Sequence, residues 1–368
     1  MFIFIFLFLL FPINLYSKGI YIVEERNGKT YTQPFTSQTP EQIGEKIKEL
    51  FDLKMDNSNK VGYNPIISSY MKSLYKKMEK YQQQEGNHDE EEEVKTWLTA
   101  DKIISSMARQ VSHRLSDNSY NILFSRDVIP ILTAEQSIVK AQLRVHVKGL
   151  VSPTFFVLDD TNLADDTILV SNNDPIIVSD ILPILTRWSE SHTSALPMIS
   201  IHASTESNLE FEAFIVVALK DTRNEDIPKR RARREVPTTP LTSSPMKQKM
   251  RRSESAYFEK TGANALCQRK GMYVDFDALG WKQWVIAPEG FSAFYCSGAC
   301  SAPFHQTMNA TSHAIVQSLI HLVRPNATAA SKCAPSHLGT LSILFVDNKK
   351  DVQIKRYRDM IVEECGCH

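Results

Sequence analysis

Six cysteines are the residues of this chain whose type and spacing point most directly to a chemistry. They lie in the C-terminal part of the 368-residue sequence, at Cys267, Cys296, Cys300, Cys333, Cys365 and Cys367. An even number of cysteines in a short exported segment indicates disulfide bonds, and six cysteines allow fifteen pairings. Clustered thiolates beside a terminal histidine also form a zinc-ligand set, so the spacing alone leaves a metal site as an alternative.

One set of bonds is consistent with the spacing, although the spacing does not exclude the other pairings. This set is Cys267–Cys333, Cys296–Cys365 and Cys300–Cys367. The last two bonds would close a ring of eight residues, and the first bond could pass through that ring. Side chains would block so small an opening, so the glycines Gly298 and Gly366 fit this arrangement.

The region before the cysteines, from residue 18 to about 220, reads as one folded region of mixed α and β structure. Apolar residues at helical spacing predict helices over residues 41–53 and 68–78, and a third over 97–111. The acidic, glutamine-rich run 82–93 is predicted to be a solvated linker.

Beyond about residue 120 the pattern changes to short alternating runs, which predict strands. A short helix is predicted over residues 180–188, and the turn residues 172–175 separate two of the strands. The predicted strands are 141–147, 154–158, 167–170, 198–203 and 211–219.

The N-terminus is apolar from Phe2 to Ile13 and then polar. This stretch is shorter than the roughly 20 apolar residues that a transmembrane helix needs. It is typical of the core of a secretory signal, with residues 1–17 as the signal peptide; a buried N-terminal helix or strand is the alternative. No later stretch is long and apolar enough to span a membrane, so we expect a soluble, exported product.

Residues 221–260 are rich in Pro, Thr, Ser and basic residues, which predicts an exposed and flexible segment. Within it, residues 231–234 have the R-x-R-R form that secretory proprotein convertases cut, through Arg231, Arg233 and Arg234. A weaker second site ends at Arg251 and Arg252. A heparan sulfate patch or a solvated loop is the alternative, but the position between a cysteine-free and a cysteine-rich region favours cleavage. The predicted propeptide is then 18–234, followed by a flexible arm, 235–266.

The composition argues against several classes of function. The formal net charge is zero, so no bulk attraction to nucleic acid is implied. The sequence contains no G-x-S-x-G, H-E-x-x-H or phosphate-loop motif. We therefore expect no enzymatic activity, no cofactor and no metal.

Three long motifs carry a resemblance to a known family. They are M-Y-V-D-F-D-A-L-G-W-K-Q-W-V-I-A-P-E-G-F-S-A-F-Y-C-S-G-A-C, M-N-A-T-S-H-A-I-V-Q-S-L-I-H and K-R-Y-R-D-M-I-V-E-E-C-G-C-H. Together they resemble a bone morphogenetic protein, a branch of the transforming growth factor β superfamily of secreted ligands, over residues 267–368. In the propeptide, A-Q-L-R-V-H-V and S-D-I-L-P-I-L-T-R-W resemble pieces of the family's prodomain.

The resemblance implies an α+β prodomain, with N-terminal helices and then a β-rich arm, before a cystine-knot growth factor domain. That domain should be mainly β, with two finger hairpins and one wrist helix. Finger one is expected from residues 272–276 and 290–296, and finger two from 341–346 and 352–357. Thr311 or Ser312 can cap the helix. Its apolar face consists of Ile315, Val316, Leu319, Ile320, Leu322 and Val323.

The resemblance also assigns binding surfaces. Trp281 and Trp284 match a type I receptor surface, and the alternative is that they pack within finger one. The family's type I receptor phenylalanine is replaced by Ala302, so Phe304 is the candidate substitute. The residues that match the type II receptor surface are Ala287, Pro288, Ser342 and Leu344, of which Leu344 could instead be a core residue. Glycan acceptor motifs begin at Asn309 and Asn326.

Assembly is the point at which this sequence departs from the family. Most members have two adjacent cysteines where this chain has Lys332 and Cys333, and the first of them bonds to its twin across the dimer. Lys332 therefore implies a non-covalent homodimer, or a heterodimer with a related ligand. The implied function is to bridge type I and type II receptor serine/threonine kinases and so activate Smad signalling, with the chain's own propeptide as a further partner. A secreted antagonist is the alternative.

Overall fold

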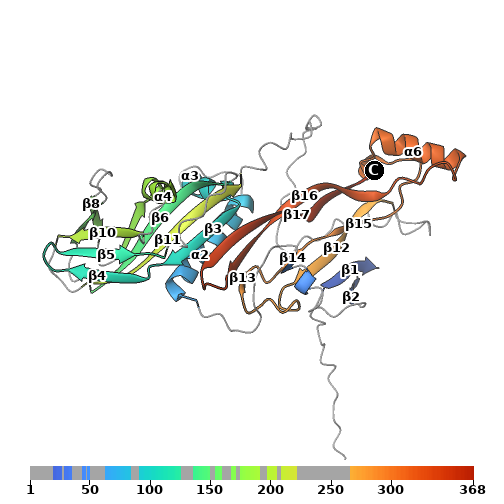
Figure 1. Cartoon of the computed structure of the whole chain (residues 1–368). Helices are drawn as coiled ribbons and strands as arrows, with labels where there is room; N and C mark the ends of the chain where they lie inside the picture. Colours follow the sequence, from blue (N-terminus) through green and yellow to red (C-terminus); the bar gives the residue numbers. More distant parts are fainter. Residues whose placement is uncertain are drawn as a thin grey trace, which may run out of the picture.

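The computed structural model describes residues 20–26, 29–34, 44–46, 48–49, 63–83, 91–125, 136–149, 154–159, 167–170, 175–190, 197–204, 209–221 and 266–368. These residues form an elongated molecule, with the cysteine-rich segment towards one end and the β-rich arm at the other (Figure 1). The predicted signal peptide and the basic cleavage motifs lie outside the described residues.

The N-terminal region combines helices with strands. Its helices are α2 (Pro65–Gln83), α3 (Glu91–Thr99) and α4 (Leu182–Glu190). Its first strands are β1 (Ile20–Arg26), β2 (Lys29–Pro34), β3 (Lys102–Met107), β4 (Gln110–Arg114), β5 (Ser119–Leu123) and β6 (Gln136–Lys148). The remaining strands are β7 (Thr154–Asp159), β8 (Thr167–Val170), β9 (Ile176–Asp180), β10 (Met198–Ala203) and β11 (Glu210–Asp221).

Two predictions for this region are wrong. The expected linker 82–93 is partly helical, since α2 continues to Gln83 and α3 begins at Glu91. The expected helix 97–111 ends after Thr99 and gives way to β3 and β4. The cause is alternate burial, because Ile103 and Ser105 face the interior at the two-residue period of a strand. For the predicted helix 41–53, residues 44–46 and 48–49 are helical, and its apolar residues lie outside the described ranges.

Strand β11 organises the propeptide core because both of its faces are covered. Ala213, Ile215 and Val217 join one apolar cluster with the arm strands, while Phe214 and Val216 join another cluster with α2. Buried residues at every position from 213 to 219 therefore reflect a central strand between two layers.

The cysteine-rich domain has two long hairpins and one helix, as the resemblance implied. Finger one contains β12 (Gln268–Asp275), β13 (Val285–Ala287), β14 (Gly290–Ser292) and β15 (Tyr295–Ser297). The 3₁₀ helix η3 (Gln306–Met308) and the wrist helix α6 (Ser312–Val323) follow, before finger two, β16 (Cys333–Val346) and β17 (Val352–Cys367). The expected strand 290–296 is divided into β14 and β15, because Phe294 between them has a left-handed backbone, φ of +56°. The other three expected finger strands are present and longer than predicted.

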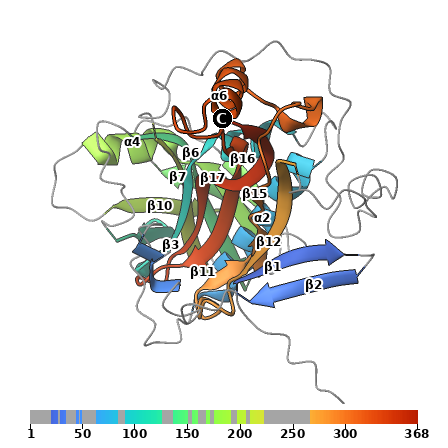
Figure 2. The same ribbon diagram turned by 90° about the vertical axis from the view of Figure 1, so that its right-hand side faces the viewer.

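The propeptide and the cysteine-rich domain share their sheets. One seven-stranded sheet runs β13-β16-β17-β3-β11-β6-β9, so propeptide strand β3 pairs directly with finger two. Strand β1 pairs with β12 of finger one in a second sheet, and Figure 2 shows β1 and β2 extending from that finger. The two predicted domains therefore meet through backbone hydrogen bonds at both fingers.

Candidate functional site

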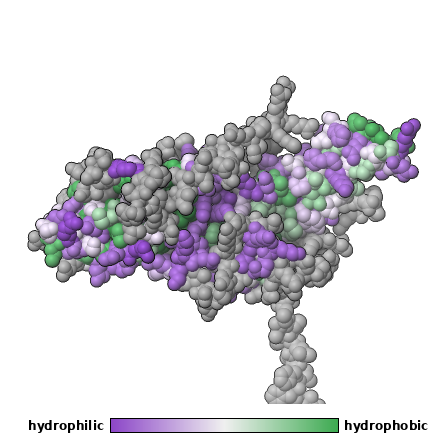
Figure 3. Space-filling model, in the orientation of Figure 1, coloured by the Kyte–Doolittle hydropathy of each residue, from purple (hydrophilic) through white to green (hydrophobic). Residues whose placement is uncertain are grey.

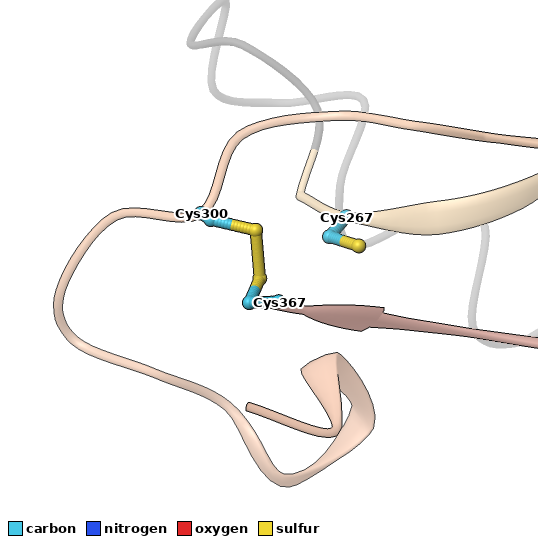
Figure 4. A group of neighbouring side chains, drawn as sticks. All are labelled: Cys267, Cys300 and Cys367. Carbon is cyan, nitrogen blue, oxygen red and sulfur yellow. A yellow bond between two sulfur atoms is a disulfide. The ribbon is translucent and has the colours of Figure 1, made fainter. Parts of the chain in front are cut away.

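Three disulfides form the centre of the C-terminal domain. They are Cys267–Cys333, Cys296–Cys365 and Cys300–Cys367, with Cα–Cα distances of 5.3, 5.7 and 5.7 Å. Figure 4 shows the Cys300–Cys367 bond with the sulfur of Cys267 beside it. The structure thus contains the pairing that fitted the sequence, and every thiol that a zinc site would need is bonded to another cysteine.

Two glycines make the small ring feasible. Gly298 has φ of +131°, a conformation that other residues rarely adopt. At Gly366, an added Cβ would lie 2.8 Å from the carbonyl oxygen of Asn309. A side chain at position 298 would therefore strain the backbone, and one at position 366 would displace the segment around Asn309.

The segment that carries Lys332 is held by its backbone. The amide of Lys332 donates to the carbonyl of His368 at 2.8 Å, and the amide of His368 donates back at 2.9 Å. Just before it, the buried hydroxyl of Ser331 lies 2.6 Å from that of Ser318, and both hydroxyls lie within hydrogen-bond reach of the carbonyl of Cys300. The Lys332 side chain itself is exposed.

Helix α6 faces the knot with small and polar residues and turns its apolar residues outward. Thr311 is its N-cap, and its hydroxyl accepts a hydrogen bond from the amide of Ala314 at 3.1 Å. Ala314 and Ser318 are buried against the domain. The exposed apolar residues are Ile315, Val316, Leu319, Ile320, Leu322 and Val323. They contribute to the hydrophobic patch over α6 in Figure 3.

The finger-one tryptophans are buried in the full chain, which corrects the expectation of an exposed patch. Trp281 is 0% exposed and Trp284 is 2% exposed. Their ring centroids are 5.0 Å apart, Trp281 stacks on Phe276 at 5.4 Å, and Trp284 meets Phe345 edge-on at 6.2 Å. The alternative, packing within finger one, is correct for the contact with Phe276, but Trp284 also packs against Phe345 of finger two.

A segment of the predicted propeptide lies directly against Trp281. An added Cβ at Gly44 would be 2.6 Å from the carbonyl oxygen of Leu279 and 3.3 Å from Nε1 of Trp281. Nearby, Lys48 is buried although it carries a charge, and its ammonium pairs with Glu45 at 3.1 Å. The close approach requires glycine at position 44, so the propeptide contributes to covering this face of finger one.

The candidate type II receptor residues are also covered by the propeptide. Leu344 is 0% exposed and belongs to the apolar cluster that α2 forms through Met71 and Leu74. The hydroxyl of Tyr75 donates to the carbonyl of Ser342 at 3.1 Å. Burial raises the pKa of Tyr75 well above its usual range, and the nearby carboxylate of Glu79 adds to the shift. The expected exposed patch is therefore an interface with α2 in the precursor.

The remaining candidate residues of this surface are less deeply buried. Ala287 packs against the edge of the α2 cluster. Ala287, Pro288 and Ser342 are all half-buried in the precursor.

Strand β3 extends this interface along the edge of finger two. Ile103 and Ile104 pair with Ile354 and Gln353 of β17, and the buried hydroxyl of Ser105 donates to the carbonyl of Val352 at 2.6 Å. This contact was not predicted, because residues 102–107 fall within the helix expected over 97–111. The alternation around Ile103 and Ser105 was the signal that could have identified the strand.

Asp101 adds charge to the same interface. Its carboxylate accepts a hydrogen bond from Arg358 at 2.8 Å and another from the amide of Asp221 at 3.0 Å. The backbone amide of Arg356 donates to the carbonyl of Asp101, and its guanidinium donates to the carbonyl of Leu98. Burial lowers the pKa of Arg356, which the negative charge of Asp101 partly opposes.

Other candidate residues sit at the wrist. Phe304 is half-buried against the cluster around the disulfides, while Ala302 is exposed. Asn309 and Asn326 are both exposed, and Nδ2 of Asn309 donates to Glu364 at 3.3 Å. The processing residues Arg231, Arg233, Arg234, Arg251 and Arg252 lie outside the described residues.

Comparison with known proteins identifies the class of the C-terminal domain. Residues 266–367 match the family described as transforming growth factor beta like domain. The three knotted disulfides and two fingers of this segment agree with the match to a growth factor domain. Among the residues that the structure describes, no helix is long and apolar enough to cross a membrane.

Three curated relatives share this segment, and one of them is a bone morphogenetic protein. The chain is 53% identical over 102 residues to Protein 60A of Drosophila virilis, covering 28% of this chain and 23% of that protein. It is 50% identical over 103 residues to Bone morphogenetic protein 8A of Homo sapiens, covering 28% and 26%. Against Protein DVR-1 of Danio rerio the identity is 42% over 117 residues, covering 32% and 33%. The similarity thus spans a quarter to a third of the length of these relatives.

Proposed function

We propose that this chain is a secreted growth factor precursor whose processed C-terminal domain bridges type I and type II receptor serine/threonine kinases and activates Smad signalling. The mechanism is valency, because bringing two receptors together requires two compatible surfaces and no chemistry. The match of residues 266–367 to the growth factor family supports the class of protein.

One observation carries the proposal furthest. The two tryptophans and Leu344, which are candidates for different receptor classes, belong to clusters on opposite faces of the finger sheet. Along β16, Ile343 and Phe345 face the cluster that contains the tryptophans, whereas Leu344 and Val346 face the cluster that contains α2. Alternate side chains of a strand point to opposite faces, so one domain can present both surfaces at once without overlap.

The propeptide contributes to covering both faces in the precursor, through the segment at Gly44 and through α2. Receptor binding therefore requires that the propeptide leave, and cleavage after Arg234 is the step that we propose to permit it. The basic motif supports this role because it lies between the last strand of the arm and Cys267. The basic runs 229–234 and 247–252 are also the proposed contacts for heparan sulfate.

Dimerisation is proposed to occur through the first part of the exposed apolar face of α6, at Ile315, Val316 and Leu319. A dimer that persists at nanomolar concentration needs about 12 kcal/mol of association free energy. All six cysteines are bonded within one chain, so that free energy must come from non-covalent burial. The same lack of a covalent link leaves exchange with a relative's subunit kinetically open.

A second candidate function is a secreted antagonist that uses the same domain. Two observations favour it: Ala302 is exposed where the family has a receptor-binding phenylalanine, and Lys332 replaces the inter-chain cysteine. A domain that binds type I receptors weakly would still occupy type II receptors, but it would not bring the two classes together.

A reporter assay for receptor-activated Smads separates the two candidates. The full chain is secreted from cells, its N-terminus is sequenced, and the processed product is applied alone or with an agonist relative. The matched control is a variant that lacks both basic motifs, with Arg231→Ala and Arg234→Ala at the first and Arg251→Ala and Arg252→Ala at the second. We expect signal from the processed product alone and little from the control. No signal alone, together with a lowered signal from the agonist, would establish the antagonist instead.

A further inference from the structure

Two glycan acceptor motifs flank the wrist helix, and their asparagines have different surroundings. Asn309 lies close to the disulfide core, with a left-handed backbone, φ of +42°. Its amide donates to Glu364 at 3.3 Å, and its carbonyl oxygen lies against Gly366. The threonine of this motif, Thr311, caps α6. This acceptor is exposed but already engaged by its neighbours.

Asn326 occupies an open turn just after α6. The amide of Ala327 donates to the carbonyl of Arg324 at 2.9 Å, which closes a β-turn with Pro325 at its second position. Asn326 is exposed, and among the described residues its side chain has no hydrogen-bond partner. The turn therefore presents this asparagine to solvent.

The chain after the turn is tied back to the helix. A ring nitrogen of His321 lies 2.7 Å from the carbonyl oxygen of Thr328, and the side-chain amide of Gln317 donates to the carbonyl of Ala329 at 2.8 Å. Gln317 and His321 are one helical turn apart and share a face. These bonds fix the turn at the C-terminal end of α6.

That end of the helix is also its most exposed apolar part. Leu322 is 71% exposed and Val323 is 79% exposed, more than any other apolar residue of α6. Asn326 follows Val323 by three residues, so the two lie within about 11 Å along even a fully extended chain. An N-linked glycan is bulky and solubilising, and one on Asn326 would be attached within this distance of Val323.

We propose that Asn326 carries an N-linked glycan that shields Leu322 and Val323 and limits association of the domain beyond its dimer. The proposal rests on the proposed secretion of the chain. The glycan leaves Ile315, Val316 and Leu319, nearer the start of α6, available to the partner subunit. An exposed apolar patch without such a cover favours non-specific association.

Occupancy is tested first on the secreted full chain, by intact mass before and after PNGase F treatment. Asn326→Gln and Thr328→Ala should each lose one glycan, since each destroys the same acceptor motif. Asn309→Gln is the matched control, and it should keep the glycan on Asn326. A secreted protein with sugar on Asn309 and none on Asn326 overturns this inference alone. A chain retained inside cells with both motifs bare contradicts the proposed secretion, and the inference falls with it.

Association is tested next, by light scattering of the processed protein. Enzymatic removal of the glycan from the folded wild-type protein should raise the average mass about twofold or more, because Leu322 and Val323 become free to associate. The Asn326→Gln variant should behave in the same way, and adding Leu322→Gln should reverse the change. The enzymatic arm avoids any folding defect of the variants. An unchanged mass after deglycosylation overturns the proposed shielding.

Discussion

At the scale of single residues, Trp281 and Trp284 form the aromatic centre of the fingers, because Phe276 and Phe345 pack against their rings. Their spacing and resemblance to the family identified Trp281 and Trp284 as important, and the structure places them side by side. Their burial could not be predicted from local spacing, because residues that pack on them, such as Phe345, and the segment at Gly44 lie far away in the sequence. Tryptophan suits both settings, since it is a strong core residue and a common interface anchor.

Gly44→Val should displace the propeptide segment from finger one. Its new Cβ would lie 2.6 Å from the carbonyl oxygen of Leu279, a distance that a backbone contact cannot accommodate. In the uncleaved precursor we expect tryptophan fluorescence to become more accessible to acrylamide quenching. Lys46→Ala, at an exposed position of the same segment, is the control. Equal quenching of the two variants would mean that Gly44 does not hold this contact.

Phe304→Ala tests the substitute for the missing family phenylalanine. We expect at least a tenfold loss of type I receptor affinity in the processed domain, about 1.4 kcal/mol. Binding to an immobilised type I receptor ectodomain measures it, with type II binding as the control for folding. An unchanged dissociation constant removes Phe304 from the type I receptor surface.

At the scale of elements, local sequence patterns predicted helix α2 correctly but did not predict strand β3, whose partners are distant in the sequence. Helix α2 was predicted because Met71, Leu74 and Tyr75 repeat at helical spacing, and all three are buried. Strand β3 was missed because its main partners, β11 and β17, come much later in the chain. A six-residue strand has too few alternations to outweigh the helical pattern that precedes it.

Tyr75→Phe should weaken the hold of the propeptide on the processed domain. The change removes only the hydroxyl that donates to the carbonyl of Ser342 and leaves the ring in the apolar cluster. A lost hydrogen bond of this kind costs about 1 kcal/mol, or about a fivefold rise in dissociation constant. Interferometry with the separated propeptide measures it. The control is Tyr63→Phe, at an exposed position, which should leave the dissociation constant unchanged. If Tyr75→Phe also has the dissociation constant of the wild type, this bond contributes nothing.

At the scale of the whole molecule, the disulfides compensate for a thin domain. Closing the 66-residue span between Cys267 and Cys333 contributes about 4 kcal/mol in the chain-entropy description. The cysteine pattern and the family resemblance together gave this core correctly. The sharing of sheets between propeptide and growth factor domain was not predictable, because no local pattern records which distant strand edges will pair.

Lys332 should leave the processed protein without an inter-chain bond. All six cysteines are paired within the chain, so we expect a band of single-chain mass on a gel without reductant. The variant Lys332→Cys is the matched positive control and should give a reductant-sensitive band of twice that mass, since position 332 is exposed. A reductant-sensitive dimer of the wild-type protein would contradict the assignment of Lys332.

The central claim is that one processed domain binds two receptor classes through opposite faces of its finger sheet. The most direct test captures the processed domain on an immobilised type II receptor ectodomain and then supplies a type I ectodomain. The account predicts a second, additive binding response. Leu344→Asp, on the face that α2 covers in the precursor, should abolish capture without changing type I binding in solution. Competition between the two ectodomains for the wild-type domain would contradict the account.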